Sequence, residues 1–212
     1  MRNLLFVLLI IFLANLANGR RFLNSAEQDV VTTKHNEIRS QVASGEYEGL
    51  NDEKLPSAAD MIELVYDRGL ETVAQKYAEQ CDWEHSGSGG ENLASFSGEH
   101  AKSDLLDMAV EMWFSESTYF NVTNVKRYQK QPEAMVGHFT QLVWAKTARL
   151  GCGVAHCDEI LNMDTHFNHG YVVVCKYHPP GNYKRKALYK QGKPCSQCPK
   201  DSDCHKNLCS KF

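Results

Sequence analysis

The sequence has few long apolar runs after its first nineteen residues, and it has no excess of positive charge. No later segment reaches the length and apolarity that a transmembrane helix needs. Lys and Arg total 23 against 26 Asp and Glu, which gives a net charge of −3. A mildly acidic chain is poorly suited to neutralise a phosphate backbone, so nucleic acid is not expected as its partner.

The first nineteen residues have the composition of a secretory signal peptide. Met1, Arg2 and Asn3 precede an apolar run over residues 4–13, and a stretch rich in small residues follows as far as Gly19. The run is too short to span a bilayer. We expect cleavage after Gly19 and a soluble product that is secreted to the extracellular space.

Eight cysteines in a secreted chain indicate disulfides, and their even number leaves none obligatorily unpaired. Four of them, Cys195, Cys198, Cys204 and Cys209, resemble a zinc knuckle in spacing. An oxidising compartment favours disulfides over zinc for this cluster. Four cysteines allow three pairings, and the spacing alone does not choose between them.

Apolar periodicity predicts three amphipathic helices, at residues 28–44, 58–81 and 103–116. Gly69 interrupts the second helix, and Ser103 is positioned to cap the third. The first helix places four residues on one face: Val31, His35, Ile38 and Val42. The third has a similar stripe: Leu106, Ala109, Val110 and Trp113.

Two segments rich in β-branched and aromatic residues, 143–155 and 171–178, predict a pair of antiparallel strands. Pro179 and Pro180 end the second strand, because proline cannot continue a ladder of hydrogen bonds. A basic linker that begins at Lys184 leads to the cysteine cluster. Helices followed by strands in this order predict an α+β domain.

Two histidines and two glutamates, each beside aromatic residues, form the most informative polar group. His138 lies within a strongly apolar, β-prone run, and His85 precedes a glycine-rich stretch that leads to Glu91. Glu116 follows Trp113 by three residues. A lone histidine in such a run is usually a buried core residue. The four together indicate one polar site on an apolar scaffold.

Four motifs give the chain a resemblance to the CAP superfamily, which groups cysteine-rich secretory proteins, insect venom antigens and plant pathogenesis-related proteins. The motifs occur in the family's order and read HNEIR (35–39), GENL (90–93), GHFTQLVW (137–144) and YVVVCKY (171–177). Within the family, the chain most resembles the single-domain venom-allergen-like secreted proteins of parasitic nematodes.

The resemblance implies an architecture for the whole chain. Residues 20–183 are expected to form an α-β-α sandwich with a central antiparallel sheet. Residues 184–212 are expected to form a basic linker and a small disulfide-rich hinge. Four disulfides are also implied by the resemblance: Cys81 with Cys157, Cys152 with Cys175, Cys195 with Cys204, and Cys198 with Cys209.

The resemblance further implies a solvent-open cleft lined by His85, Glu91, Glu116 and His138. The two histidines are the expected ligands of a divalent ion such as zinc, and the carboxylates either bind the ion or orient the imidazole rings. No cofactor is expected to be obligatory. Glu111 competes with Glu116, but five residues, about 140° of helix, separate them, so only one should face the cleft.

A purely structural role is the first alternative, in which each histidine and carboxylate satisfy each other's hydrogen bonds. Hydrolysis is the second, either metal-assisted or by Ser86. Ser86 with His138 and Glu91 has the residue types of a catalytic triad. No nucleophile elbow surrounds Ser86, so no residue is assigned a catalytic role and the chain is not expected to be an enzyme.

Binding is the expected function, because the resemblance implies apolar grooves that hold a sterol or a fatty acid. Helices 28–44 and 103–116 would form the walls, and an aromatic loop would contribute Tyr119, Phe120 and Tyr128. Asn121 in this loop is an N-glycosylation sequon. The expected partners are a lipid and a host protein, with modulation of host responses and no more than weak homodimerisation.

Overall fold

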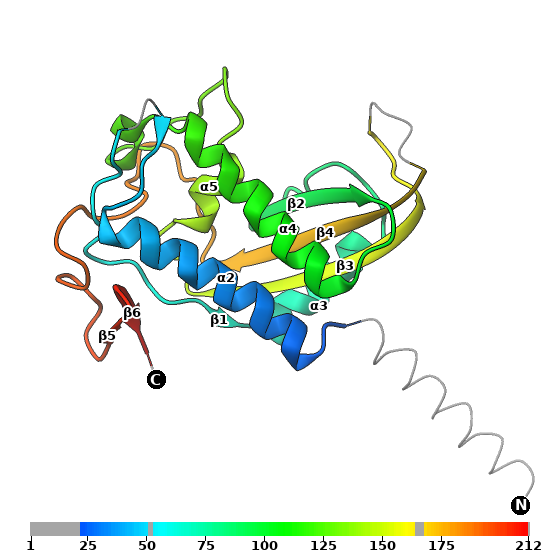
Figure 1. Ribbon diagram of the computed structural model, residues 1–212, viewed down its shortest axis with the longest axis horizontal. Coiled ribbons are helices and arrows are strands. Elements are labelled where there is room, and N and C mark those ends of the chain that lie inside the picture. The colour runs from blue at the N-terminus through cyan, green and yellow to red at the C-terminus, as the bar shows by residue number, and fades with distance from the viewer. Residues whose placement is uncertain (1–21, 51–52, 164–167, 212) are drawn as a thin grey trace, which may run out of the picture.

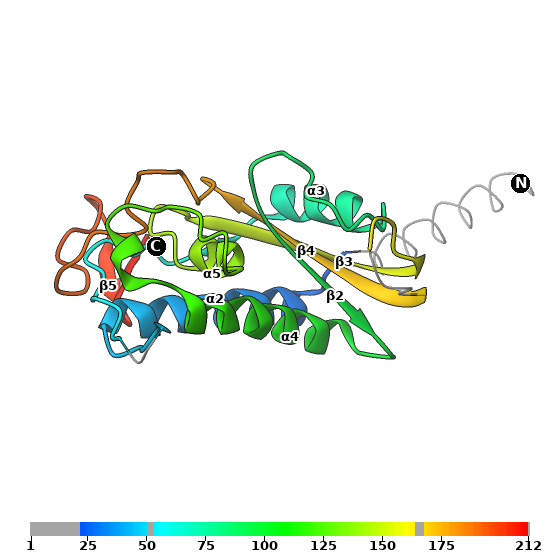
Figure 2. The ribbon, with the colours of Figure 1, turned by 90° about the horizontal axis from the view of Figure 1, so that it is seen from above.

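The computed structural model describes residues 22–50, 53–163 and 168–211, so the predicted signal peptide lies outside the described residues. A four-stranded sheet forms the middle layer, with the strand order β1-β3-β4-β2. Helices α2 (Ser25–Ser44) and α4 (Lys102–Ser115) cover one face, and α3 (Arg68–Ala78) covers the other (Figures 1 and 2). The predicted α-β-α sandwich is confirmed. None of the helices in these ranges is long and apolar enough to cross a membrane.

The sheet has a long antiparallel core. Strands β2 (Gly90–Ser97), β3 (Arg149–Glu159) and β4 (Asn168–His178) pair antiparallel, while the two-residue β1 (Val65–Tyr66) pairs parallel with β3. Gly151 and Gly153 face α3, where an added Cβ would lie 2.2 Å and 2.4 Å from helix backbone nitrogens. These glycines therefore allow α3 to pack closely on the sheet.

The predicted second helix is wrong over its first half, because residues 58–67 are irregular apart from β1, and α3 begins only at Arg68. Tertiary hydrogen bonds replace the helical ones. The side-chain amide of Asn36 donates to the carbonyl of Leu64, whose N–H donates back to Asn36, and Arg39 donates to the carbonyl of Ile62. Helix α3 then begins where the carboxylate of Asp67 caps it.

The third helix begins at Lys102, and its N-cap is Ala101 rather than Ser103 as predicted. The hydroxyl of Ser103 lies inside the first turn, 3.3 Å from the Asp104 carboxylate. The predicted stripe from Leu106 to Trp113 is fully buried. A 3₁₀ turn, η2 (Glu116–Tyr119), follows directly, and a second, η3 (Val122–Val125), lies in the loop beyond it.

The β-prone run after residue 136 is also corrected, because it forms the short helix α5 (Gly137–Leu142), and β3 begins at Arg149 rather than at residue 143. The buried guanidinium of Arg39 donates to the carbonyls of Leu142, Trp144 and Ala145. These carbonyls therefore have partners outside any sheet, which leaves the segment free to turn.

The eight cysteines form four disulfides, which are the pairs that the resemblance implies. The last two staple a tail that contains β5 (Asp203–His205) and β6 (Leu208–Ser210), so its cysteines do not form a zinc knuckle. The tail lies beside the C-terminal end of α2 (Figure 1). Its Leu208 is buried in the main core, and backbone hydrogen bonds join Cys209 to Met61 and Glu63.

Candidate functional site

His85 and Glu91 form the first half of the cleft. His85 lies in the loop before β2, and its Nδ1 donates to Oε1 of Glu91 at 2.9 Å. The backbone N–H of Ser86 donates to the same oxygen. The imidazole of His85 is 59% exposed while the Glu91 carboxylate is 4% exposed, so the carboxylate is a buried anchor for an accessible ring.

His138 and Glu116 form the second half. Oε1 of Glu116 accepts a hydrogen bond from Nδ1 of His138 at 2.6 Å, and its Oε2 accepts the backbone N–H groups of His138 and Phe139. Helix α5 has no side-chain cap of its own, so Glu116 caps it from the end of α4. One carboxylate thus orients the ring and holds the helix that carries it.

The two halves meet, because the rings of His85 and His138 lie with their centroids 6.1 Å apart. Trp113 stacks against His138 with ring centroids 6.1 Å apart, and its indole N–H donates to the carbonyl of Leu93. The two histidines and Glu91 line a cavity of about 430 Å³ together with Trp83, Tyr128, Lys130 and Met135. Because both Nδ1 atoms are bonded to carboxylates, the Nε2 atoms are the nitrogens that remain to bind a ligand.

Lys176 belongs to this site, although the sequence analysis missed it. It lies opposite Glu91 in the pairing of β2 with β4, is 4% exposed, and pairs with Oε2 of Glu91 at 2.5 Å. Burial raises the pKa of the Glu91 carboxyl, but hydrogen bonds from His85, Lys176 and Ser86 outweigh burial and lower this pKa to about 2. A lysine in the apolar run YVVVCKY was the available signal.

The cleft offers two imidazole rings as candidate metal ligands. In the part of the chain that the structure describes, no group of three or more His, Cys, Asp or Glu side chains is arranged to hold a metal ion. Glu91 and Glu116 bond the Nδ1 atoms and orient the rings. Two imidazoles are fewer than the three or four protein ligands of most zinc sites.

Ser86 is not part of a triad in this geometry. Its hydroxyl accepts a hydrogen bond from Lys176 Nζ at 2.5 Å and lies 3.1 Å from the hydroxyl of Ser88, and Glu91, the carboxylate of the expected triad, bonds His85 rather than His138. Glu111, the competing carboxylate, pairs with Lys34 on α2. Neither glutamate lines the cavity itself, but Glu116 bonds the ring of His138, which does, so Glu116 is the glutamate that belongs to the site.

One family model matches a continuous range of the chain that includes the sequence motifs. Residues 32–177, which contain all four cleft residues and nearly all of the four-stranded sheet and its covering helices, match the model of the cysteine-rich secretory protein family, CAP. The chain belongs to the CAP family.

Relatives of this CAP chain come from animals as different from one another as cattle and Ancylostoma. Peptidase inhibitor 16 of Bos taurus is 36% identical over 190 residues, which cover 88% of this chain and 37% of the relative. Ancylostoma secreted protein of Ancylostoma caninum is 32% identical and covers 89% of this chain and 45% of the relative. The chain therefore spans little more than a third of the length of the first of these relatives. Because mammals and Ancylostoma match about equally, the nematode subgroup remains a prediction.

Among solved structures, the crystal structure of NaASP2 with Zn²⁺ is 32% identical, with a TM-score of 0.74 over 89% of this chain and 97% of that one. The crystal structure of Na-ASP-1 has the same identity and a TM-score of 0.78, over 89% of this chain and 48% of that one. Both agree with the CAP fold.

The predicted lipid loop of this CAP chain is largely buried. Phe120 packs edge-on against Phe139, and Tyr128 packs against Trp144, so neither presents free apolar surface. Tyr119 is 59% exposed. Asn121 is exposed, and its side-chain oxygen accepts hydrogen bonds from the backbone and hydroxyl of Thr123.

The groove predicted between the first and third helices is bridged by ion pairs. Lys34 on α2 pairs with Asp107 and Glu111 on α4, and the hollow beside these residues is open to solvent. The buried faces of the two helices pack into the common core. The hollow is a shallow surface with charged side chains in its lining, and it would not enclose an apolar ligand.

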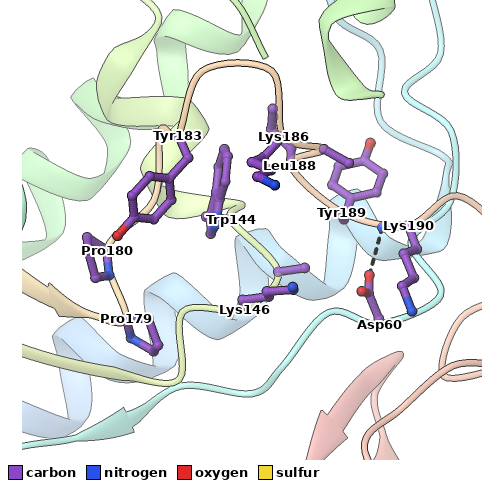
Figure 3. A pocket seen from close by; sticks show the side chains of 12 residues that line it. Asp60, Trp144, Lys146, Pro179, Pro180, Tyr183, Lys186, Leu188, Tyr189 and Lys190 are labelled. Atoms are coloured by element: carbon purple, nitrogen blue, oxygen red, sulfur yellow. Dashed lines mark hydrogen bonds between the residues drawn. The ribbon is translucent and has the colours of Figure 1, made fainter. Parts of the chain in front are cut away.

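An apolar pocket of about 440 Å³ lies elsewhere, between the end of α5 and the segment after β4. Figure 3 shows Pro179, Pro180 and Tyr183 on one side, and Leu188 and Tyr189 on the other, with Trp144 between them. Gly181 is required here, because an added Cβ would lie 2.8 Å from the Trp144 side chain. We call this hollow the Trp144 pocket.

Proposed function

We propose that this chain is a secreted, glycosylated binding protein that holds a sterol or another lipid, such as a fatty acid, and modulates host responses through that ligand. The Trp144 pocket carries the proposal, because it is concave, mostly apolar and of the size that small-molecule sites have, about 300–1,000 Å³. As in the venom-allergen-like proteins of parasitic nematodes, the partner would be a host lipid or protein. Exposed Asn121 would carry the glycan.

The polar groups around the pocket suit an amphipathic ligand. Lys146, Lys186 and Lys190 lie among its lining residues, where aliphatic stems can cover apolar surface while the ammonium groups stay in water. The one lining carboxylate, Asp60, already accepts the backbone N–H of Lys190 (Figure 3). A ligand with an apolar body and a hydroxyl or carboxylate head matches this lining.

The predicted aromatic loop supports the pocket from behind. The ring of Tyr128 packs edge-on against Trp144, with centroids 6.0 Å apart. The loop therefore contributes to the pocket as its supporting wall, and Tyr119 is the loop residue that solvent and ligands can reach.

Two exposed tyrosines test the proposal as a matched pair. Tyr183→Ala removes a half-exposed wall of the pocket, and we expect affinity for radiolabelled cholesterol or palmitate to fall roughly tenfold, the loss expected for part of a buried aromatic contact. Tyr119→Ala removes a similarly exposed ring from the loop and should leave affinity unchanged. Absence of lipid binding by the wild type would refute the function. A loss of lipid affinity in Tyr119→Ala but not in Tyr183→Ala would instead assign the lipid site to the loop surface.

Zinc binding in the cleft is a second candidate function. It is favoured because Glu91 and Glu116 hold both Nδ1 atoms and leave two Nε2 atoms on rings 6.1 Å apart. The structure of NaASP2, a relative, was solved with Zn²⁺. We propose weak, exchangeable binding in which His85 and His138 are the ligands and water completes the coordination.

Calorimetric titration with zinc tests this second proposal. His85→Ala should abolish measurable affinity without disturbing the core, since its ring is exposed. His205→Ala is the matched control, because His205 also bonds a carboxylate through Nδ1, that of Glu63, but lies in the tail. Affinity should also weaken on acidification, because protonated imidazole cannot bind a metal. Equal affinity in wild type and His85→Ala would leave the four cleft residues with a structural role.

Hydrolysis by the cleft is the less favoured function. Ser86 contacts Lys176 rather than an imidazole, and Nζ of Lys176 is already paired with the buried carboxylate of Glu91, so no base stands beside the Ser86 hydroxyl.

A further inference from the structure

The second half of the chain separates its charges by sign. Residues 117–132 and 165–200 contain no Asp or Glu, although the whole chain is net acidic. The first segment contains Lys126, Arg127 and Lys130, and the second includes Lys184, Arg185 and Lys186. Chain folding could scatter these cations or bring them together.

The fold brings them together. The backbone N–H of Tyr128 donates to the carbonyl of Lys186 at 2.8 Å, and the N–H of Arg185 donates to the carbonyl of Tyr128 at 2.9 Å. The turn at Arg185 has a φ of 65°, a left-handed conformation that a non-glycine residue adopts at some cost. The hydrogen bonds on either side hold it.

A hollow of about 430 Å³ lies where the two basic segments meet. Its floor is the buried Tyr128, and its rim consists of Arg127, Gln129, Lys130, Lys184 and Arg185, all exposed. No carboxylate lines it. Within the described residues, none of the four rim cations forms a salt bridge. We call this hollow the basic groove.

We propose that the basic groove binds a sulfated polysaccharide of the extracellular matrix or cell surface. Four unpaired cations on the two sides of a concave, polar hollow can contact successive sulfate groups of a linear polyanion, and release of condensed counterions then drives binding. Arginine adds paired donors that match the oxygens of a sulfate.

The shape of the site favours a polysaccharide over a lipid surface. A bilayer is flat and would meet only the rim, and no groove residue is an exposed apolar side chain that could insert between lipids. Lys130 also lines the histidine cleft, so a polymer in the groove could continue along the surface toward His138.

Heparin hexasaccharide is the probe for this proposal, and two charge-matched variants give the test. The groove variant combines Arg127→Gln, Lys130→Gln, Lys184→Gln and Arg185→Gln. The control combines Lys193→Gln, Lys200→Gln, Lys206→Gln and Lys211→Gln, four exposed cations of the tail. Both variants have the same net charge, so only the position of the lost cations differs.

At 150 mM salt we expect the groove variant to lose heparin affinity tenfold or more and the control to stay within twofold. The slope of log affinity against log salt should become shallower in the groove variant alone, because fewer counterions are released. Circular dichroism and unfolding midpoints check that both variants fold. The single charge reversal Lys184→Glu should also lower heparin affinity, and it changes the fold less than the fourfold variant does.

Three results would overturn the proposal. The first is no heparin binding by the wild type at 150 mM salt, and the second is an equal loss in both variants, which would indicate a nonspecific effect of net charge. The third is groove-dependent binding to phosphatidylserine vesicles without heparin binding, which would assign the groove to a membrane surface. None of these outcomes depends on lipid binding in the Trp144 pocket.

Discussion

Single residues in the cleft carry charges that the fold has removed from water. Glu91 and Lys176 are each 4% exposed and have each other as partners, so the removal of either leaves the other charge buried and uncompensated. His35 on α2 is a separate buried group with a neutral ring. Burial lowers the pKa of His35 to about 4, and its two nitrogens bond the Val31 carbonyl and the Tyr177 hydroxyl.

Glu91→Gln should therefore lower the free energy of unfolding by about 3–5 kcal/mol at pH 7, the usual cost of breaking a buried ion pair. Because the folded-state pKa of Glu91 is lowered from 4.5 to about 2, its stabilisation is present above pH 4.5 and is lost as the pH falls toward 2. The difference in unfolding free energy between wild type and Glu91→Gln should therefore shrink as the pH falls from 4.5 to 2. Guanidinium denaturation with intact disulfides measures this free energy at each pH.

The matched control for this prediction is Glu159→Gln, which removes an exposed carboxylate from β3 and should change stability by no more than about 0.5 kcal/mol. Coincident denaturation curves for wild type and Glu91→Gln would contradict the buried pair.

At the scale of elements, the short helix α5 depends on a residue from another helix. Six residues are too few for a helix to be stable by itself, and the only carboxylate that satisfies its first N–H groups in the described structure comes from Glu116. The position of His138 is thereby tied to the end of α4.

Glu116→Ala should lower the unfolding free energy by about 1–2 kcal/mol through loss of this cap and should weaken zinc affinity about tenfold or more, because the His138 ring loses its orienting partner. Glu111→Ala on the same helix removes only a surface ion pair with Lys34 and should cost less than about 1 kcal/mol. Thermal unfolding and zinc titration measure both effects. Similar losses in the two variants would argue against a special role for Glu116.

Helices and strands were predictable from the sequence where the local apolar periodicity agrees with the tertiary contacts that the segment makes. The apolar stripes of α2 and α4 predicted their buried faces, because packing decides both. The segments 58–67 and 143–148 were misassigned, because Arg39, more than a hundred residues away from the second segment, donates hydrogen bonds to carbonyls of both. The cleft histidines came from family motifs. Lys176 was missed because only strand register places it opposite Glu91.

At the scale of the whole molecule, the cysteine-rich tail is part of the main core. Leu208 is 1% exposed among core side chains, and hydrogen bonds join residues 190–209 to residues 57–63. The basic segment before the tail is likewise bonded to Tyr128. The segment predicted as a linker and hinge therefore helps to build both the Trp144 pocket and the basic groove.

Leu208→Ala should destabilise the entire protein by about 2–5 kcal/mol, the cost of a cavity in a packed core. Leu161→Ala is the control, because Leu161 is 50% exposed and its loss should change stability by less than about 0.5 kcal/mol. Calorimetry should find one transition that shifts to lower temperature in the first variant. A separate low-temperature transition for the tail would indicate an independent unit.

The pattern of disulfides has a consequence for proteolysis. Two bridges lie wholly within residues 81–175 and two wholly within residues 195–209, so no covalent cross-link joins the tail to the body apart from the backbone itself. A trypsin-like cut at the exposed Lys184 or Arg185 would leave two chains that stay associated through Leu208 and the backbone hydrogen bonds. A protease with trypsin-like specificity would thus nick the molecule without separating its two parts.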